Sequence, residues 1–102
     1  MTSTDLETKS VESRAATFGA LSDPIRLSIL DQLNRDQRCV CELQDALDVA
    51  PNLLSYHLRI LREAGLVEST RRGRWVDYQL SDDAASMVAA ALPATLIDEV
   101  PR

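Results

Sequence analysis

The sequence lacks any hydrophobic run long enough to span a membrane. No apolar stretch approaches the roughly 18 residues that a membrane helix requires, and residues 1–10 are too polar and acidic to act as a secretory signal. Cysteine is scarce as well, because the chain has only 2. Two cysteines in a chain without an export signal indicate the reducing cytosol. We therefore expect a cytoplasmic protein with no membrane partner.

Groups for acid–base or nucleophilic catalysis are also few. His57 is the only histidine, the 2 cysteines stand close together, and the carboxylates are scattered along the chain. These residues form no set of nucleophile and general base, so the sequence predicts no enzyme. A chain of 102 residues has room for one domain. Because the core of so short a chain is marginal, we expect it to associate into an oligomer.

Basic residues are the minority, with 11 Lys and Arg against 16 Asp and Glu, and the net charge is −5. An acidic balance argues at first against a nucleic-acid partner, but the distribution of charge matters more than its sum. Residues 51–76 carry a local charge of +3, whereas the remainder carries −8. One basic segment on an acidic body allows contact with DNA along one face while the rest repels non-specific polyanion binding.

Apolar residues at helical spacing predict four helices in the first two thirds of the chain. These helices cover residues 11–21, 24–33, 39–47 and 51–64. The last two are joined by about three residues, which makes a helix-turn-helix. Residues 1–10 have too few apolar side chains to be held down, so we expect a disordered N-terminal arm there.

Start and stop signals support these helix boundaries. Asp23 can cap the second helix, and Pro24 suits its first turn. Asp48 tolerates the left-handed conformation with which helices often end. Pro51 begins the fourth helix, and Gly65 ends it.

After the fourth helix the apolar period changes from helical to alternating, which predicts a β-hairpin. Residues 66–71 and 75–80 are predicted as strands, and the turn between them carries arginines. We call this predicted hairpin, residues 66–80, the wing.

A final helix, residues 82–92, is rich in alanine, and Pro93 should end it. It is apolar nearly all round and needs a partner, which residues 11–21 would supply across a two-fold axis. Four helices, two strands and a helix make a mainly α fold with a β-hairpin (α+β). This is the order of a winged helix-turn-helix domain, here spanning residues 11–102 and forming a homodimer through its first and last helices.

The helix over residues 51–64 has one apolar and one polar face. A helical wheel places Leu54, Leu58 and Leu61 together, opposite a stripe of amide, hydroxyl, phenol and guanidinium groups. Such groups contact base edges and phosphates in the major groove. Any amphipathic surface helix shows a polar stripe, but a helix that follows a short turn and precedes an arginine-tipped hairpin favours DNA reading. The candidate DNA-binding residues are Asn52, Ser55, Tyr56, Arg59 and Arg62 on the helix, and Arg71, Arg72 and Arg74 on the wing, which suit minor-groove or phosphate contacts.

His57 lies at the edge of the apolar face, about 60° from Leu54 around the wheel. This position favours a half-buried, hydrogen-bonded histidine over a metal ligand or a pH switch.

Three motifs in order resemble the ArsR/SmtB family of metal- and metalloid-responsive repressors. Residues 54–67 are similar to the pattern L-S-x-H-L-x-x-L-x-x-A-G-L-V, residues 21–26 to L-x-D-P-x-R, and residues 73–78 to G-R-x-x-x-Y. The resemblance implies a homodimer that binds double-stranded operator DNA at two half-sites and is released by an inducer. One departure is Ala50, where the family often has a serine cap before the reading helix; Pro51 could compensate by presetting the first turn.

Residues 39–43 resemble the C-V-C-[DE]-L element of the family's arsenite and soft-metal sensors. This resemblance implies an inducer site at Cys39 and Cys41, with no permanent cofactor. Soft thiolates favour As(III), Sb(III) and soft divalent ions such as Cd(II). Side chains two residues apart on a helix point about 200° apart, so an ion held by both requires the first helical turn to be unwound.

The family's sensors of this type often have a third cysteine, which is Gln44 here. The third ligand is therefore open: water, a small thiol or a carboxylate such as Glu42. Two thiolates can hold As(III), whereas a tetrahedral Zn(II) or Cd(II) site would lack ligands. The family's second site would fall on Asp83, Ala85, Leu96 and Glu99, and its two histidines are missing, so we expect no zinc there.

Several alternatives stay open at this point. The two cysteines can be small apolar residues that begin a helix, or a redox sensor, although neighbours two apart within a helix make a strained disulfide. A regulator of the same fold could sense oxidants, another metal such as Cd, Zn or Ni, or no metal. The net charge of −5 is the main argument for an interaction module that binds no DNA.

Overall fold

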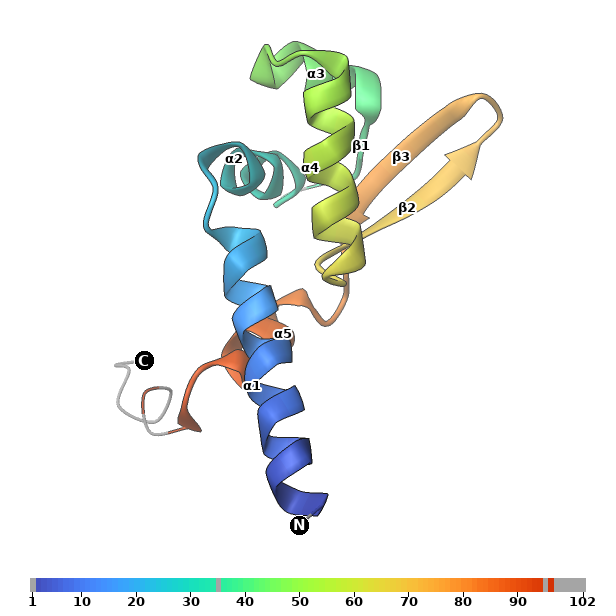
Figure 1. Cartoon of the computed structure of the whole chain (residues 1–102). Helices are drawn as coiled ribbons and strands as arrows, with labels where there is room; N and C mark the ends of the chain where they lie inside the picture. Colours follow the sequence, from blue (N-terminus) through green and yellow to red (C-terminus); the bar gives the residue numbers. More distant parts are fainter. Residues whose placement is uncertain (1, 35, 95, 97–102) are drawn as a thin grey trace.

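The computed structural model of the chain describes residues 2–34, 36–94 and 96 (Figure 1). Its elements follow in the order α1 (Thr2–Leu21), α2 (Pro24–Leu33), β1 (Arg38–Cys39), α3 (Val40–Leu47), α4 (Pro51–Glu63), β2 (Val67–Arg72), β3 (Trp75–Leu80) and α5 (Ala84–Ala91). The predicted winged helix-turn-helix is confirmed, with α3 and α4 as its helix pair and β2–β3 as the wing. Over the described ranges, no helix combines the length and the apolar content that crossing a membrane requires.

The predicted signals at the helix ends operate as expected. The Asp23 carboxylate accepts hydrogen bonds from the backbone N–H groups of Ile25, at 2.8 Å, and Arg26, at 3.2 Å, and so caps α2. Asp48 ends α3 in the left-handed conformation, with φ 51°. At the start of α4 no side chain caps the helix, and Pro51 occupies its first turn.

The tight turn after α4 requires glycine. Gly65 has φ +81°, a conformation that residues with a Cβ rarely adopt, and a Cβ there would lie 3.2 Å from the Met87 Cε. This turn lets the chain leave α4 and enter β2 while α5 packs against it.

The structure differs from the sequence prediction in α1 and α3, whereas α2 has the predicted bounds. The helix α1 begins at Thr2, where residues 1–10 were predicted to be a disordered arm. Once a helix exists, each added residue gains a hydrogen bond without a new nucleation cost, and Leu6, Glu7 and Lys9 are good helix formers. In α3, which begins at Val40 where the prediction had residue 39, Leu43 carries the buried face of the helix.

A third strand, β1, was not predicted. It pairs antiparallel with β3, so the sheet has the order β1-β3-β2. Only two residues, Arg38 and Cys39, form β1, and so short a strand leaves no alternating pattern in the sequence. It joins the start of α3 to the base of the wing.

The core lies where α4 packs on α2, α3 and the base of the wing (Figure 1). The three leucines predicted for the buried face of α4 are 0–2% exposed, and they meet Ile29 and Leu43 in the core cluster. Full burial of one such side chain contributes about 1.5–3 kcal/mol. The apolar side of α4 is thus fixed, which leaves its opposite side free.

The first and last helices pack on each other within one chain. Arg14 in α1 donates to the carbonyl of Ala91 in α5, at 3.1 Å. The apolar face predicted for α1 is largely uncovered, however: Val11 is 56% and Phe18 37% exposed. The last helix, predicted for residues 82–92, spans 84–91, and no side chain caps its start.

Candidate DNA interface and thiol pair

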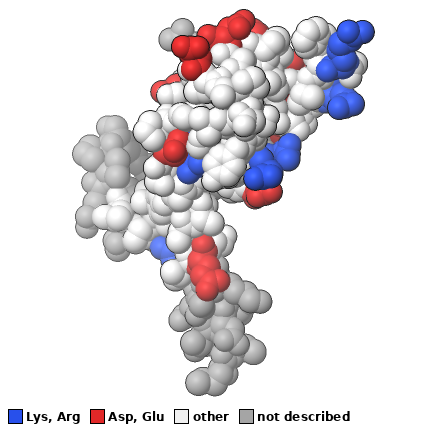
Figure 2. All heavy atoms as spheres, turned by 45° about the horizontal axis from the view of Figure 1, so that its top comes forward, with Lys and Arg blue, Asp and Glu red and all other residues white. Residues whose placement is uncertain are grey.

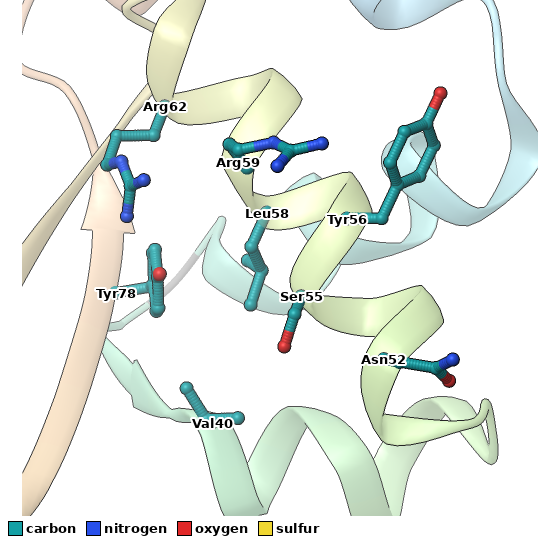
Figure 3. A pocket seen from close by; sticks show the side chains of 8 residues that line it. All are labelled: Val40, Asn52, Ser55, Tyr56, Leu58, Arg59, Arg62 and Tyr78. Carbon is teal, nitrogen blue, oxygen red and sulfur yellow. The ribbon is translucent and has the colours of Figure 1, made fainter.

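The polar stripe of α4 forms one wall of an open groove. The five candidate residues of this helix, Asn52, Ser55, Tyr56, Arg59 and Arg62, are all exposed. They line a groove of about 450 Å³ whose other wall includes Val40 at the start of α3 and Tyr78 in β3 (Figure 3). The structure therefore brings the predicted reading residues together on one surface, between α4 and the sheet.

Two of these side chains are oriented by a contact with each other. The Arg59 guanidinium carbon lies 5.8 Å from the centre of the Tyr56 ring, within the range of a cation–π interaction. The Tyr56 ring also meets the His57 ring edge-on, with centroids 5.1 Å apart. Tyr56 itself is 47% exposed. A stacked arginine beside an exposed phenol presents charge and hydrogen-bonding groups in a defined direction.

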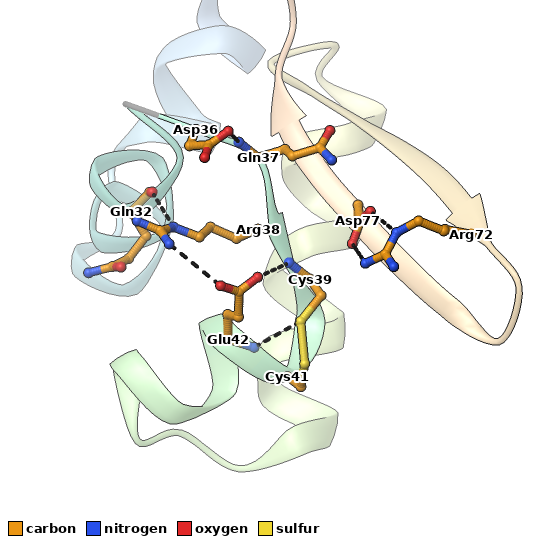
Figure 4. A network of polar contacts seen from close by, with 9 residues as sticks. All are labelled: Gln32, Asp36, Gln37, Arg38, Cys39, Cys41, Glu42, Arg72 and Asp77. Atoms are coloured by element: carbon orange, nitrogen blue, oxygen red, sulfur yellow. Dashed lines mark hydrogen bonds and ion pairs between the residues drawn. A yellow bond between two sulfur atoms is a disulfide. The ribbon is translucent and has the colours of Figure 1, made fainter.

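The three wing arginines fall into two classes. Arg71 and Arg74 are exposed, and no ion pair holds either of them within the described part of the chain. Arg72 instead donates two hydrogen bonds to the Asp77 carboxylate, at 2.9 and 3.3 Å (Figure 4). Figure 2 shows basic side chains gathered at the end of the wing. The acidic side chains on the same face lie mainly over other parts of the molecule.

The bond between Arg72 and Asp77 shifts the pKa of both groups. Hydrogen bonding to Asp77 and its negative charge raise the pKa of Arg72. The hydrogen bond from Arg72 lowers the pKa of Asp77, and this effect outweighs the opposing effect of desolvation. Asp77 is only 5% exposed. Arg72 was predicted as a DNA contact alongside its neighbours, but its guanidinium is already bound by a buried carboxylate inside the wing.

The two cysteines lie at the start of α3, in a geometry that the helical wheel did not predict. Cys39 precedes the helix as its N-cap, with extended backbone at φ −75° and ψ 160°, and only Cys41 lies in the first turn. Their Cα atoms are 5.3 Å apart, and a disulfide joins the sulfurs (Figure 4). The turn is thus already open at Cys39, which removes the helical argument against a bond between the two.

Glu42 is the hydrogen-bonding partner of Cys39 at this helix start. The Cys39 sulfur accepts from the Glu42 backbone N–H at 3.3 Å, and the Glu42 carboxylate accepts from the Cys39 N–H at 3.0 Å. This is a capping box with sulfur in the place of a hydroxyl. Arg38 pairs with the same carboxylate at 3.5 Å. Glu42, considered above as a third ligand, therefore already has two partners.

No ready-made metal site accompanies the thiols. Over the residues that the structure describes, no group of three or more His, Cys, Asp or Glu side chains could hold a metal ion. The Gln44 side chain, at the position of the missing third thiol, donates to the Val49 carbonyl and so helps to close the turn before α4. Glu99, one of the four positions of the family's second site, lies outside the described residues.

His57 is more buried than its wheel position predicts. It is 4% exposed, and its Nδ1 lies 2.9 Å from an Arg26 nitrogen. The expectation of a hydrogen-bonded histidine is confirmed, and Arg26 is a partner that the sequence did not reveal. Arg26 is the arginine of the L-x-D-P-x-R motif, and its presence in that motif is the signal that could have indicated this contact.

Comparison with known proteins places this arrangement in a family. The sequence pattern described as "Bacterial regulatory protein, arsR family" matches residues 23–69. The HTH-type transcriptional repressor SmtB of Mycobacterium tuberculosis is 52% identical over 63 residues, which are 62% of this chain and 47% of that protein. The arsenical resistance operon repressor of Escherichia coli is 40% identical over 86 residues, 83% of this chain and 69% of that protein.

Solved structures extend the likeness over most of the fold. An ArsR-like transcriptional regulator from Rhodococcus sp. RHA1 superposes with a TM-score of 0.78 and 30% identity, covering 89% of this chain and 84% of that one. The match to the two SmtB proteins of Mycobacterium and Synechocystis spans about half of their length, 47% and 54%. Motifs, fold and identity agree along the chain, which belongs to the ArsR family of bacterial regulatory proteins.

Proposed function

We propose that the protein is a transcriptional repressor that binds operator DNA through α4 and the wing. The observation that carries this proposal is the polar, arginine-bearing stripe of α4, which is exposed beside an arginine-tipped hairpin on an otherwise acidic chain. Asn and Arg side chains can make paired hydrogen bonds to adenine and guanine edges in the major groove. Arg71 and Arg74, both exposed, suit phosphate or minor-groove contacts beside it.

The acting unit in this proposal is a homodimer. The exposed apolar face of α1 supports it, since Val11 and Phe18 are uncovered in the single chain. A second copy packed against this face and α5 would bury these side chains and place two α4 helices for two half-sites. Half-sites read by such dimers lie about one turn of DNA, 34–36 Å, apart or a multiple of it.

The proposed inducer is As(III) or Sb(III), bound at the reduced Cys39–Cys41 pair. The extended backbone of Cys39 supports this site, because it lets both sulfurs face one atom without unwinding α3. Arsenous acid, As(OH)₃, would react with two thiols to form two As–S bonds and release two waters. The remaining hydroxide would then be the third ligand of the arsenic. A third protein sulfur is missing because position 44 is glutamine.

Oxidant sensing by the same two thiols is a second candidate. The disulfide between Cys39 and Cys41 favours it directly. The reaction would convert two thiols to one disulfide, with two electrons and two protons passing to an oxidant such as hydrogen peroxide. Both candidates act through the start of α3, and each predicts that the reduced, unliganded protein is the one bound to DNA.

The proposed DNA binding is tested with the protein's own promoter fragment, under reducing conditions and at several salt concentrations. Each phosphate contact contributes about −0.9 to the slope of log affinity against log salt. We expect a steep negative slope and a measurable loss on replacing Arg59. Binding that is absent, or equal for promoter and unrelated DNA, would favour an interaction module that does not read DNA.

A further inference from the structure

Three helices meet at one arginine that the DNA interface does not use. Arg26, in α2, donates from Nε to the Ala20 carbonyl at 2.7 Å and from one terminal nitrogen to the Gly19 carbonyl at 3.2 Å. Its other terminal nitrogen lies 2.9 Å from Nδ1 of His57, in the middle of α4. One side chain thus connects the last turn of α1, through α2, to the reading helix.

The chemistry of this connection is defined by its donors. An arginine guanidinium has five N–H donors and no acceptor, so Nδ1 of His57 must accept the bond and carries no proton. The other ring nitrogen, Nε2, faces the Asp23 carboxylate at 4.0 Å. The last carbonyls of a helix have no partner within the helix, and a cation there also interacts favourably with the helix dipole. Arg26 satisfies both needs at once.

The cluster is partly buried: Arg26 and Asp23 are half-buried, and two residues that they contact, one on α4 and one on α1, are more buried still. His57 is 4% exposed, and Ala20, whose carbonyl Arg26 holds, is also 4% exposed. Asp23 is fixed in turn by two backbone N–H groups at the start of α2. Only Ser22 and Asp23 separate α1 from α2, so the short connection and the contacts of Arg26 together restrict the angle between the two helices. In Figure 1 the junction lies above α1 and below α2, with α4 to its right.

We propose that Arg26 and His57 determine the half-site spacing that the protein prefers, by fixing the direction of α4 relative to α1. This inference rests on the proposed function, in which α1 forms the dimer and α4 reads the operator. If α1 lies at the two-fold axis, the distance between the two α4 helices depends on the angle at the α1–α2–α4 junction. Arg26 and His57 are then positioning residues: they touch no DNA, yet they select among operators.

The test measures affinity for a family of duplexes. The site protected in the protein's own promoter is lengthened or shortened at its centre by single base pairs, and each duplex is titrated with the protein. We expect the unaltered protein to bind one spacing best. The affinity for the best spacing, divided by the affinity for the other spacings, should fall on the order of 10-fold in Arg26→Gln and in His57→Leu. The mass of the dimer should stay unchanged in both variants.

Two further variants separate positioning from general damage. His57→Asn keeps an acceptor near the place of Nδ1 and should retain the spacing preference that His57→Leu loses. Arg38→Gln removes another arginine that donates to a backbone carbonyl, that of Gln32 at 3.4 Å, and should leave the preference intact. If Arg26→Gln does not fold, the comparison of His57→Leu with His57→Asn carries the test.

The outcomes are distinct. An unchanged spacing preference in His57→Leu, or equal behaviour of His57→Leu and His57→Asn, would overturn the inference while leaving the proposed repressor standing. Failure of the unaltered protein to bind any of the duplexes would overturn the proposed function and this inference with it.

Discussion

Cys39 and Asp77 are direct partners across the antiparallel ladder between β1 and β3. Asp77 in turn binds Arg72 of β2, so the strand next to Cys39 carries one member of the wing's ion pair. Figure 4 shows Cys39 at the start of α3, and Asp77 with Arg72 on the strands of the wing beside it. A movement of the Cys39 backbone therefore acts directly on Asp77, its partner in the sheet, and thereby on the wing.

The ion pair in the wing should stabilise the protein at neutral pH and lose this effect in acid. The pKa of Asp77 is lowered by the hydrogen bond from Arg72, so the carboxylate favours the folded state wherever it is charged there. This contribution is present above the ordinary Asp pKa of about 3.9 and disappears as the pH falls through the lower pKa of the folded state. Thermal unfolding of the unaltered protein and Asp77→Asn, measured from pH 7 to pH 3, should show two melting temperatures that converge at the acid end. A constant difference across this range would contradict the assignment.

Replacing Arg59 by alanine should weaken operator binding by about 1–3 kcal/mol if it contacts a base edge, or reduce the salt slope by about 1 if it contacts a phosphate. Its exposed position and its contact with Tyr56 orient it toward the groove. Fluorescence anisotropy with labelled promoter DNA measures both quantities. The matched control is Glu63→Gln, at an exposed acidic residue of the same helix, which should not weaken binding. If Arg59→Ala and the unaltered protein have equal affinity for the promoter DNA and an equal salt slope, the assignment of α4 as the DNA-reading helix is contradicted.

A charge on the apolar face of α1 should disrupt the proposed dimer. Phe18 is 37% exposed in the single chain, and burial of a glutamate there against a second copy would leave a charge without a partner. Sedimentation equilibrium of Phe18→Glu should give the monomer mass. Leu27→Glu is the control, because Leu27 is 49% exposed on α2, away from that face; it should leave the mass unchanged. A dimer that survives Phe18→Glu must use another surface.

Replacing Cys39 by serine should leave the stability of the protein unchanged, whereas replacing it by alanine should lower the stability. Cys39 caps α3 through its sulfur, and a serine hydroxyl can accept the same bond, but alanine removes it at a cost of about 0.5–2 kcal/mol. Urea unfolding of Cys39→Ser and Cys39→Ala, both in a Cys41→Ser background, measures this difference without the disulfide. Equal stability of the two proteins would show that the sulfur's hydrogen bond contributes nothing. The serine form is therefore the appropriate variant for testing the thiols.

Much of the fold follows from local patterns in the sequence. The cap at Asp23, the left-handed end at Asp48 and the glycine turn at Gly65 are each decided by a few neighbouring residues, and the structure has all three. The buried leucines of α4 follow from helical period alone. These features needed no knowledge of what lies far away in the chain.

Features that depend on distant partners were not predictable in this way. The strand β1 exists because β3 lies beside it, since two residues form no pattern of their own. The engagement of Arg72 by Asp77 and of His57 by Arg26 depends on register and helix packing, which no short-range signal in the sequence expresses. The same reason explains Cys39: a helix that starts one residue later than expected turns two opposed side chains into neighbours.

The proposed control of DNA release by Cys39 and Cys41 is tested by one titration. The reduced protein, bound to its promoter fragment, is titrated with arsenite, and the same is done with the Cys39→Ser, Cys41→Ser double variant; Cd(II), Zn(II), Ni(II) and hydrogen peroxide are run in parallel. Arsenite should release the unaltered protein, with a loss of DNA affinity of about 5- to 150-fold, and should leave the double variant bound. Release of the double variant by arsenite at the same concentration would contradict the proposed control.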